Sequence, residues 1–259
     1  MSVNHLAEIS SIAILDDFAK HYRRACGFQI ITEGYGFRYA VNDTLPFRAG
    51  SISKLMVCMA AESLLIDDFE SKVPLKSLDL NGQRSIFNLF DSRRDFTIGE
   101  ILSFAISLSD NVAANWLVDY LGAATIIDAS QRLGINIVWD TFDGFPYKVQ
   151  SQIDVQSAFK VLDEVIRFPR CFLAMKQSLN YSRIPLGVKS ANVTFYNKTA
   201  SLTGMAHDIA ILESQIGTMR VIFFSDNEPD TVIAGLEMGI TTANLIQEWA
   251  FDVNRTTGI

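Results

Sequence analysis

One stretch of this chain constrains its fold more than any other. Residues 55–65 are apolar on nearly every side of a predicted helix, so other elements must surround that helix. Gly50 and Ser51 stand just before it, and a glycine there permits a tight connection from a strand into the helix. We therefore expect a central buried helix with Ser51 in its first turn.

Strand and helix patterns are distributed unevenly around that helix. The expected strands lie near the two ends of the chain, at residues 28–31, 37–41, 193–200, 207–213 and 219–225. Further helices are expected at residues 3–25, 101–108, 111–120, 155–168 and 231–254. Thr97 and Glu100 form a predicted capping box, Asp154 is a predicted N-cap, and Pro169 is expected to end the helix that Asp154 begins.

This order predicts an α+β fold. Five strands from both termini would form one antiparallel sheet, flanked by the N- and C-terminal helices, with an all-α lobe inserted between them. The expected division places residues 1–49 and 191–259 in the sheet lobe and residues 50–190 in the all-α lobe. The two lobes would form a single structural unit.

Charge and hydropathy argue against two classes of partner. The formal net charge is −7 at pH 7 and lysine and arginine do not cluster, so we expect no nucleic-acid partner. No apolar stretch has the length of a membrane span, so we expect no membrane partner. The apolar patch at residues 12–15 has no basic segment before it and is followed at once by two aspartates, unlike a signal peptide. We therefore expect a cytoplasmic protein.

Cysteine and histidine usage predicts neither a disulfide framework nor a metal site. The three cysteines are an odd number at scattered spacings, which is typical of small core residues in a reducing compartment. The three histidines are far apart and have no cysteine beside them, so we expect no metal and no cofactor. These residues are Cys26, Cys58, Cys171, His5, His21 and His207.

Ser51 and Lys54 form a candidate nucleophile and base. Residues three apart share one face of a helix, and the N–H groups at a helix N-terminus favour a developing alkoxide or oxyanion. Burial in this apolar helix would disfavour the lysine cation and leave its amine available as a base. The pattern alone is weak, because about one such pair arises by chance in a chain of this length. The alternative is an N-cap serine beside a solvated lysine.

Two further segments carry polar groups suited to the same chemistry. Ser109-Asp110-Asn111 lies between two predicted helices, where a hydroxyl can relay a proton and an amide can hold a carbonyl. Its alternative is a simple helix N-cap. Lys198-Thr199-Ala200-Ser201 lies on a predicted strand and would offer a charge and a hydroxyl to a cleft edge. Its alternative is an ordinary polar sheet edge.

Taken together, the three segments resemble the signature of penicillin-recognising serine enzymes. The chain resembles the class A β-lactamase and D-alanyl-D-alanine peptidase superfamily over residues 28–249. Residues 47–51 resemble the lead-in to the first motif, residues 97–102 and 109–117 resemble the second-motif helices, and residues 202–208 resemble the segment after the third motif. The resemblance implies that the active site lies between the two lobes.

The resemblance also implies a role for each motif residue in catalysis. Ser51 would be the nucleophile and Lys54 the base that activates it. Ser109 would pass a proton to the leaving nitrogen, and Asn111 would hold a substrate amide. The backbone N–H groups of Ser51 and Ser201 would form an oxyanion hole, worth about 3 kcal/mol per donor.

The implied substrate-binding residues point to a carboxylate. Lys198 and Thr199 would bind a substrate carboxylate or polarise the second-motif serine. In class A enzymes an arginine at a similar point of the strand at residues 219–225 supports carboxylate binding, so Arg220 is a candidate. The alternative for Arg220 is a surface arginine at a strand end.

Two positions depart from the family pattern. Hydrolysing β-lactamases carry a glutamate in a Glu-x-x-Leu-Asn context that positions the water for cleaving the acyl-enzyme. Residues 139–152 contain no glutamate, and the nearby acids are Asp140, Asp143 and Asp154. Efficient β-lactamase turnover is therefore not expected, while acylation is less affected. Ala200 replaces the usual third-motif glycine, and its methyl group either narrows the cleft or points behind the strand.

The sequence is compatible with three functional hypotheses. The first is a serine hydrolase or acyltransferase acting on an amide, lactam or ester of a small molecule or short peptide that bears a carboxylate. The second is a genuine β-lactamase or penicillin-binding peptidase whose secretion signal is missing from this chain. The third is a catalytically silent ligand-binding descendant. The oligomeric state is not predicted.

Overall fold

The computed structural model describes residues 3–22, 26–33, 36–80, 82–91, 94–188, 192–214, 217–226 and 231–257. Its largest sheet is antiparallel and five-stranded, in the order β2-β1-β10-β9-β8. The strands are β1 (Cys26–Thr32), β2 (Phe37–Val41), β8 (Thr194–Leu202), β9 (Met205–Ser214) and β10 (Gly217–Ser225). Both ends of the chain therefore build one sheet, and the predicted α+β class with a five-stranded antiparallel sheet is confirmed.

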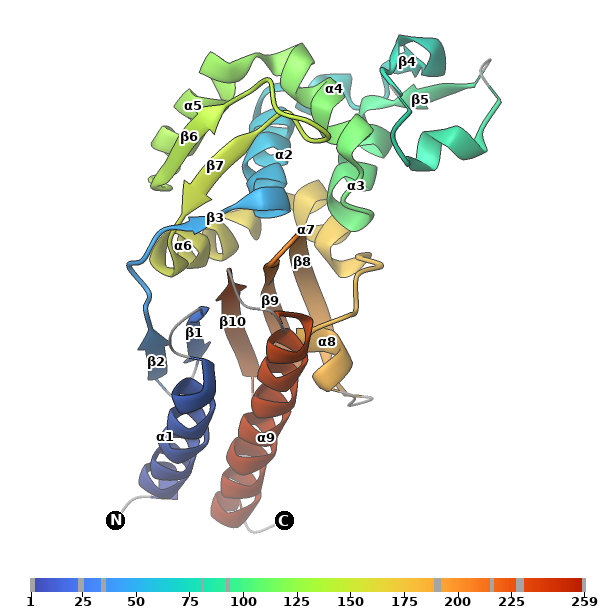
Figure 1. Cartoon of the computed structure of the whole chain (residues 1–259). Helices are drawn as coiled ribbons and strands as arrows, with labels where there is room; N and C mark the ends of the chain where they lie inside the picture. Colours follow the sequence, from blue (N-terminus) through green and yellow to red (C-terminus); the bar gives the residue numbers. More distant parts are fainter. Residues whose placement is uncertain are drawn as a thin grey trace.

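Two terminal helices cover one face of this sheet. Figure 1 shows α1 (Val3–Tyr22) and α9 (Thr231–Thr257) side by side against the strands, with most helices of the middle of the chain at the end of the sheet away from the two termini. The predicted end of the first helix, at residues 23–25, lies outside the described residues. Within the described part of the chain, no helix combines the length and apolar character needed to cross a membrane.

The central strands are buried on both faces because two separate cores meet them. Phe28, Val221 and Phe223 point into the core shared with α1 and α9. Ile209 and Ile222 point the other way, into the core shared with the helices of the middle of the chain. This double burial explains why β9 and β10 read as continuous apolar runs rather than alternating ones.

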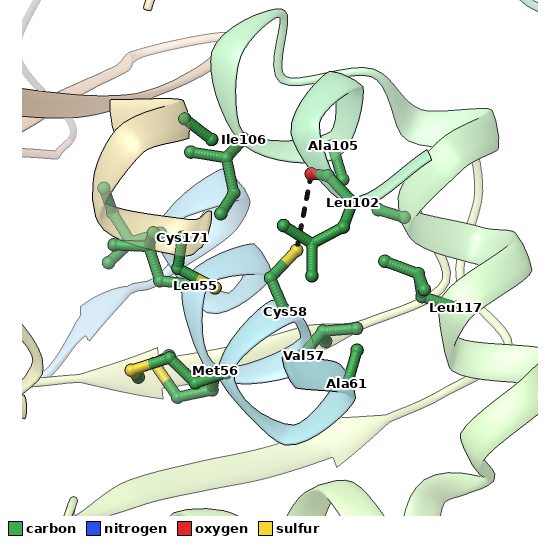
Figure 2. Close-up of a cluster of buried hydrophobic side chains, with 14 of the residues drawn as sticks. Leu55, Met56, Val57, Cys58, Ala61, Leu102, Ala105, Ile106, Leu117 and Cys171 are labelled. Carbon is green, nitrogen blue, oxygen red and sulfur yellow. Dashed lines mark hydrogen bonds between the residues drawn. The ribbon is translucent and has the colours of Figure 1, made fainter. Parts of the chain in front are cut away.

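Helix α2 (Ser53–Leu64) occupies the centre of the helical region, as its apolar sequence requires. It packs against α3 (Ile98–Ser107), α4 (Asn111–Leu121), α5 (Ala123–Arg132), α6 (Val155–Val165) and α7 (Pro169–Lys176). Figure 2 shows Leu55, Cys58 and Ala61 of α2 among side chains of these neighbours, including Leu117 and Cys171. All ten residues from Ser53 to Glu62 are buried, so α2 is a rigid platform for whatever its first turn carries.

The middle of the chain also contains strands, contrary to the expected all-α lobe. A small sheet has the order β3-β7-β6, built from β3 (Phe47–Arg48), β6 (Ile137–Thr141) and β7 (Gln150–Ile153). A second ribbon pairs β4 (Lys72–Pro74) with β5 (Asp95–Thr97). These strands are two to five residues long and polar in part, too short for a period-two pattern to stand out. The remaining short helices are α8 (Ile184–Gly187), η1 (Gly50–Ile52), η2 (Ile66–Asp68), η3 (Leu75–Ser77) and η4 (Ile86–Leu89).

The predicted capping box and the predicted N-cap are both confirmed, whereas Pro169 has a different role from the one expected. Thr97 and Glu100 form the expected capping box, and Asp154 accepts the Ser157 N–H at the start of α6. Pro169, however, begins α7 rather than simply ending α6, because proline is favoured in the first turn, where its missing N–H has no partner to lose.

Glu62 joins the end of α2 to the beginning of α7. Its carboxylate is buried and accepts the backbone N–H groups of Arg170 and Cys171, both at 2.9 Å. A carboxylate at a helix N-terminus satisfies unpaired donors and interacts favourably with the helix dipole. This contact fixes α7 against the platform helix.

Glu62→Ala is expected to lower the free energy of unfolding by about 2–4 kcal/mol, because two buried N–H groups lose a charged acceptor. Urea denaturation followed by tryptophan fluorescence measures the change. Glu70→Ala is the matched control, since Glu70 is 85% exposed and only 3.7 Å from the same Arg170, and its loss should cost less than about 0.5 kcal/mol. Equal effects of the two substitutions would show that the capping contact contributes nothing.

Candidate active site

Ser51 lies in η1, a single 3-10 turn that runs directly into α2. The turn is possible because Gly50 has a φ of +50°, a backbone conformation that L side chains rarely adopt. Ser51 is partly exposed while the residues after it are buried. The structure therefore places Ser51, which is partly exposed, at the N-terminal end of the central helix, as the sequence predicts.

Lys54 follows three residues later and is fully buried. Its Nζ donates to the Ser109 carbonyl oxygen at 2.5 Å and to Asn111 Oδ1 at 2.6 Å, and it lies 3.5 Å from Ser109 Oγ. The structure thus brings Lys54, Ser109 and Asn111 into direct contact. The alternative of a solvated lysine does not fit this burial.

Burial lowers the pKa of Lys54 to about 7, with Asp110 and Cys58 acting in the opposite direction. A neutral amine has two N–H groups and one lone pair. The Ser109 carbonyl and the Asn111 amide oxygen accept both N–H groups, so the lone pair is left to receive a proton. This geometry suits a general base near neutral pH.

The Ser109-Asp110-Asn111 segment is both a helix cap and a part of the site. Asp110 is the N-cap of α4, accepting the Ala113 N–H at 3.0 Å, and it also accepts bonds from Ser85 Oγ and the Ile86 N–H. Ser109 has a φ of 57°, an unusual value for a residue other than glycine. That backbone turn directs the Ser109 carbonyl to Lys54. The Asp110 carboxylate, in contrast, is used to cap α4.

Lys198 reaches the same serine from the sheet. It lies on β8, is fully buried, and its Nζ donates to Ser109 Oγ and to the Thr199 carbonyl, both at 2.8 Å. Burial lowers the pKa of Lys198 well below its ordinary value, and the charge of Lys54 acts in the same direction. Ser109 Oγ is therefore placed between two lysine amines, which suits a hydroxyl that passes protons.

Ala200 does not narrow the cleft. It is buried, and its methyl group points toward Gly50 on the η1 side of β8. A methyl group added to Gly50 would lie 3.3 Å from Ala200 Cβ and 2.6 Å from the flexible Cε of Met205. The missing side chain of Gly50 thus accommodates the extra methyl of Ala200, which explains how the third motif tolerates alanine.

Thr199 and Ser201 lie on the opposite face of β8 from Lys198 and Ala200, because successive strand residues alternate. Thr199 is buried, whereas Ser201 is exposed. Arg183, which the sequence reading missed, donates from Nη2 to Ser201 Oγ at 2.6 Å and from Nη1 to the His207 carbonyl at 2.9 Å. No local pattern around Arg183 marks it, since only the fold brings it to β8.

Arg183 is a buried cation, and no carboxylate of the described part of the chain bonds to it directly. It is 3% exposed, and its Nε has no hydrogen-bond partner among the described residues. The nearby carboxylate is Asp208, which accepts from the Ile184 N–H and Asn197 Nδ2 at 3.1 Å each. Burial raises the pKa of Asp208 to about 7, so near neutral pH it offsets the cation only in part.

Arg220 is not part of this cluster, and the expectation that it supports carboxylate binding is not upheld. Its guanidinium forms ion pairs with Glu33 and with Asp163, the latter at 3.2 Å, and stacks over Phe159. Strand register explains the difference: Arg220 is aligned with Ile211, which pairs with Tyr196, at the other end of the sheet from Ser201. Arg220 instead ties the sheet to α6.

The loop between β6 and β7 brings no carboxylate to Ser51 or Lys54 among the described contacts. Asp154 is occupied as the N-cap of α6, and Asp143 bonds to Thr141 at the loop's own base. Asp140 accepts a long bond of 3.4 Å from Gln152 Nε2. The described contacts of these three residues are therefore with other groups, and whether an aspartate substitutes for the family's glutamate stays a prediction from the sequence.

His207 is a structural residue of the sheet. Its Nε2 is 2.7 Å from the Arg48 carbonyl, its Nδ1 accepts the Ser225 N–H at 3.2 Å, and burial lowers its pKa to about 4. The ring is therefore neutral and committed at both nitrogens. Among the described residues, no three histidine, cysteine, aspartate or glutamate side chains gather as a metal site requires, and the three cysteines are buried and form no disulfide.

Comparison with known proteins agrees with this geometry. The sequence model described as the β-lactamase enzyme family matches residues 11–246. The chain belongs to the β-lactamase enzyme family. Membership supports a serine hydrolase of this superfamily without specifying its substrate. No curated protein sequence matches significantly.

Solved structures of the family share the fold at low sequence identity. A β-lactamase from Sphaerobacter thermophilus is 19% identical with a TM-score of 0.74, covering 91% of this chain and 94% of its own. A β-lactamase from Desulfarculus baarsii is 18% identical with a TM-score of 0.74, covering 92% and 98%. A variant of PBP-A, solved as an acyl-enzyme complex with penicillin G, is 14% identical with a TM-score of 0.78, covering 92% and 97%.

The fit between Gly50 and Ala200 in this family member is open to a direct test. Gly50→Ala is expected to lower the free energy of unfolding by about 1–3 kcal/mol, through backbone strain and crowding. Adding Ala200→Gly should recover part of that loss, because it removes the methyl that Gly50 accommodates. Urea denaturation of the four proteins of the cycle measures both effects.

Gly204→Ala is the control for backbone strain alone. Gly204 has a φ of +70° but open space around its missing Cβ, so its substitution should cost about 1 kcal/mol. Ala200→Gly should not improve that variant. An additive cycle at Gly50 and Ala200 would show that the two positions do not share space.

Proposed function

We propose that this protein is a serine acyl-transfer enzyme that forms a covalent ester on Ser51. The observation that carries the proposal is the Lys54 amine, which is buried, bonded to two neutral oxygens and three residues from an accessible serine. A lysine in this environment supports removal of the Ser51 proton without help from histidine. The substrate would be an amide, lactam or ester.

The cluster supports a complete proton path for acylation. The Lys54 lone pair takes the Ser51 proton while Ser51 Oγ bonds to the substrate carbonyl carbon. Backbone N–H groups at the start of α2 and on β8 would stabilise the oxyanion. As the carbon–nitrogen bond breaks, Ser109 gives its proton to the leaving nitrogen and regains one from the Lys54 ammonium, 3.5 Å from its Oγ. The products are a Ser51 ester and a free amine.

The charge balance of the site favours a substrate that bears a carboxylate. The Arg183 guanidinium is buried, and the neighbouring Asp208 is only partly ionised near neutral pH, so the positive charge of Arg183 is offset only in part. The exposed Ser201 hydroxyl accepts from Arg183, so its own proton is free to be donated outward. A substrate carboxylate at Ser201 would therefore face a polarised donor and a buried guanidinium.

The fate of the acyl group distinguishes two candidate activities. Family membership favours a β-lactamase, which hydrolyses the ester quickly. The described contacts of Asp140, Asp143 and Asp154 are with groups other than Lys54, so none of these three carboxylates is seen to bond to the amine. We therefore favour slow hydrolysis, or transfer to an acceptor other than water, over rapid β-lactam turnover.

Acylation of Ser51 is expected with a fluorophosphonate and with a penicillin, detected by intact-mass spectrometry. The labelling rate should rise with pH and reach half of its plateau near pH 7, because the unprotonated Lys54 amine is the reactive base. Ser51→Ala should abolish both adducts. Ser53→Ala is the matched control, since Ser53 lies in the same motif but donates to the Gly50 carbonyl, and it should retain them.

Absence of any adduct on the wild-type protein would rule out the acyl-enzyme. A penicillin adduct that persists for hours supports slow hydrolysis, whereas rapid turnover of nitrocefin would establish β-lactamase activity instead.

Arg183 is expected to act only on substrates that carry a carboxylate. Arg183→Gln should slow penicillin acylation by about 10- to 100-fold, the cost of losing a charged hydrogen-bond donor. Labelling by a fluorophosphonate, which has no carboxylate, should change little and reports that the site is intact. Arg220→Gln is the control arginine and should leave the ratio of the two rates unchanged. An equal loss of both rates in Arg183→Gln would mean that Arg183 only supports the fold.

A further inference from the structure

The loop between β6 and β7 places an aromatic ring on Lys54. The Lys54 Nζ lies 4.8 Å from the centroid of the Tyr147 ring, within the range of a cation–π contact. Tyr147 is partly buried, and burial raises the pKa of its hydroxyl, so the phenol stays neutral. No motif of the sequence singles out this tyrosine.

The loop is held on both sides of Tyr147 by one residue of α4. Asn115 Nδ2 donates to the Pro146 carbonyl at 2.9 Å, and Asn115 Oδ1 accepts the Lys148 N–H at 2.8 Å. Lys148 is also paired with Asp119, one turn further along α4, at 2.5 Å. Helix α4 therefore holds the loop backbone on both sides of Tyr147 and so fixes the position of the ring.

The Tyr147 hydroxyl makes a second contact with the first motif. It lies 3.4 Å from Ser53 Oγ. Ser53 has one hydroxyl proton, which the Gly50 carbonyl accepts at the shorter distance of 2.7 Å, so Tyr147 is left as the donor of the longer bond. Tyr147 thus contacts both residues that follow Ile52.

Charged groups around Lys54 come from several elements, and none of the described carboxylates bonds to it. Asp110 accepts hydrogen bonds from three other groups, and its charge raises the pKa of Lys54 from a distance. On α2 itself Cys58 is neutral, because burial raises its pKa to about 12. Lys198 approaches from β8 and repels a positive Lys54. Glu62 and Cys171 lie two turns away, at the α7 end of α2.

We propose that Tyr147 is a positioning residue whose ring face stabilises the ammonium form of Lys54 as it takes the Ser51 proton. The inference rests on the proposed function, in which that proton transfer begins acylation. No described carboxylate bonds to the Lys54 ammonium. Its stabilisation then comes from the neutral oxygens of Ser109 and Asn111 together with the Tyr147 ring. The hydroxyl of Tyr147 is secondary, and the ring carries the effect.

The test compares Tyr147→Leu with the ring-preserving Tyr147→Phe. The pKa of Lys54 is read from the Nζ resonance of protein labelled with ¹⁵N-lysine, assigned through Lys54→Met. Tyr147→Leu is expected to lower that pKa by about 0.5 to 1.5 units, because the ammonium loses the ring, while Tyr147→Phe should leave it within about 0.2 units. An unchanged or raised pKa in Tyr147→Leu would overturn the inference.

A kinetic readout accompanies the titration. At pH 9, where Lys54 is unprotonated, Tyr147→Leu should slow fluorophosphonate labelling by about two- to tenfold, and Tyr147→Phe should restore the wild-type rate. Asn115→Ala, which releases the loop without touching the ring, should shift the pKa in the same direction as Tyr147→Leu. A ring that acts only as packing would lower stability without moving the pKa.

The role of Tyr147 and the acylation of Ser51 are tested by separate measurements. The resonance of Lys54 titrates whether or not Ser51 is acylated, so the positioning role is tested even if no substrate reacts. Loss of labelling in the wild-type protein would remove the proposed function alone, whereas identical pKa values in the three proteins would remove the role of Tyr147 alone.

Discussion

Burial of the Lys54 amine is the interaction on which the rest of the site depends. A lysine in an apolar core is costly unless its polar atoms find partners, and here the Ser109 carbonyl and Asn111 Oδ1 provide them. Those partners are available only because Ser109 adopts a left-handed backbone and Asp110 is occupied by capping α4. The apolar surroundings of α2 keep water away, and the pKa of Lys54 consequently falls into the range of a base.

The sheet completes the cluster by bringing further positive charge. Lys198 bonds to Ser109 from β8, and Arg183 bonds to Ser201 on the other face of the same strand. Close approach of β8 to η1 requires a small residue at Gly50, and the methyl of Ala200 uses that space. Motif residues from three distant parts of the chain therefore meet because two packed surfaces match in size. The buried Arg183 guanidinium, whose charge Asp208 offsets only in part, gives this side of the cluster a preference for anions.

The loop between β6 and β7 is the part of the site that differs most from what membership of the β-lactamase family alone would predict. Asp143 in this loop bonds to Thr141, and the side chain that reaches Lys54 from the loop is the Tyr147 ring. An aromatic face can stabilise a cation but cannot take a proton from water, so the loop supports formation of an acyl-enzyme more than its hydrolysis. Asn115 fixes this arrangement by holding the backbone on both sides of the tyrosine.

The sequence by itself determined the central helix, the five long strands and the residues that meet at Lys54, because periodicity, capping and motif order are local properties. Two errors follow from the same limit: strands of two to five residues give no readable period, and Pro169 reads as a stop as easily as a first helical residue. Only the tertiary structure decided that Arg220 pairs with Glu33 and Asp163, that Arg183 serves Ser201 instead, and that Tyr147 covers Lys54. Each of these contacts joins residues that are far apart in the chain. Which side chains come within reach of one another is set by strand register and by loop anchoring, not by local sequence.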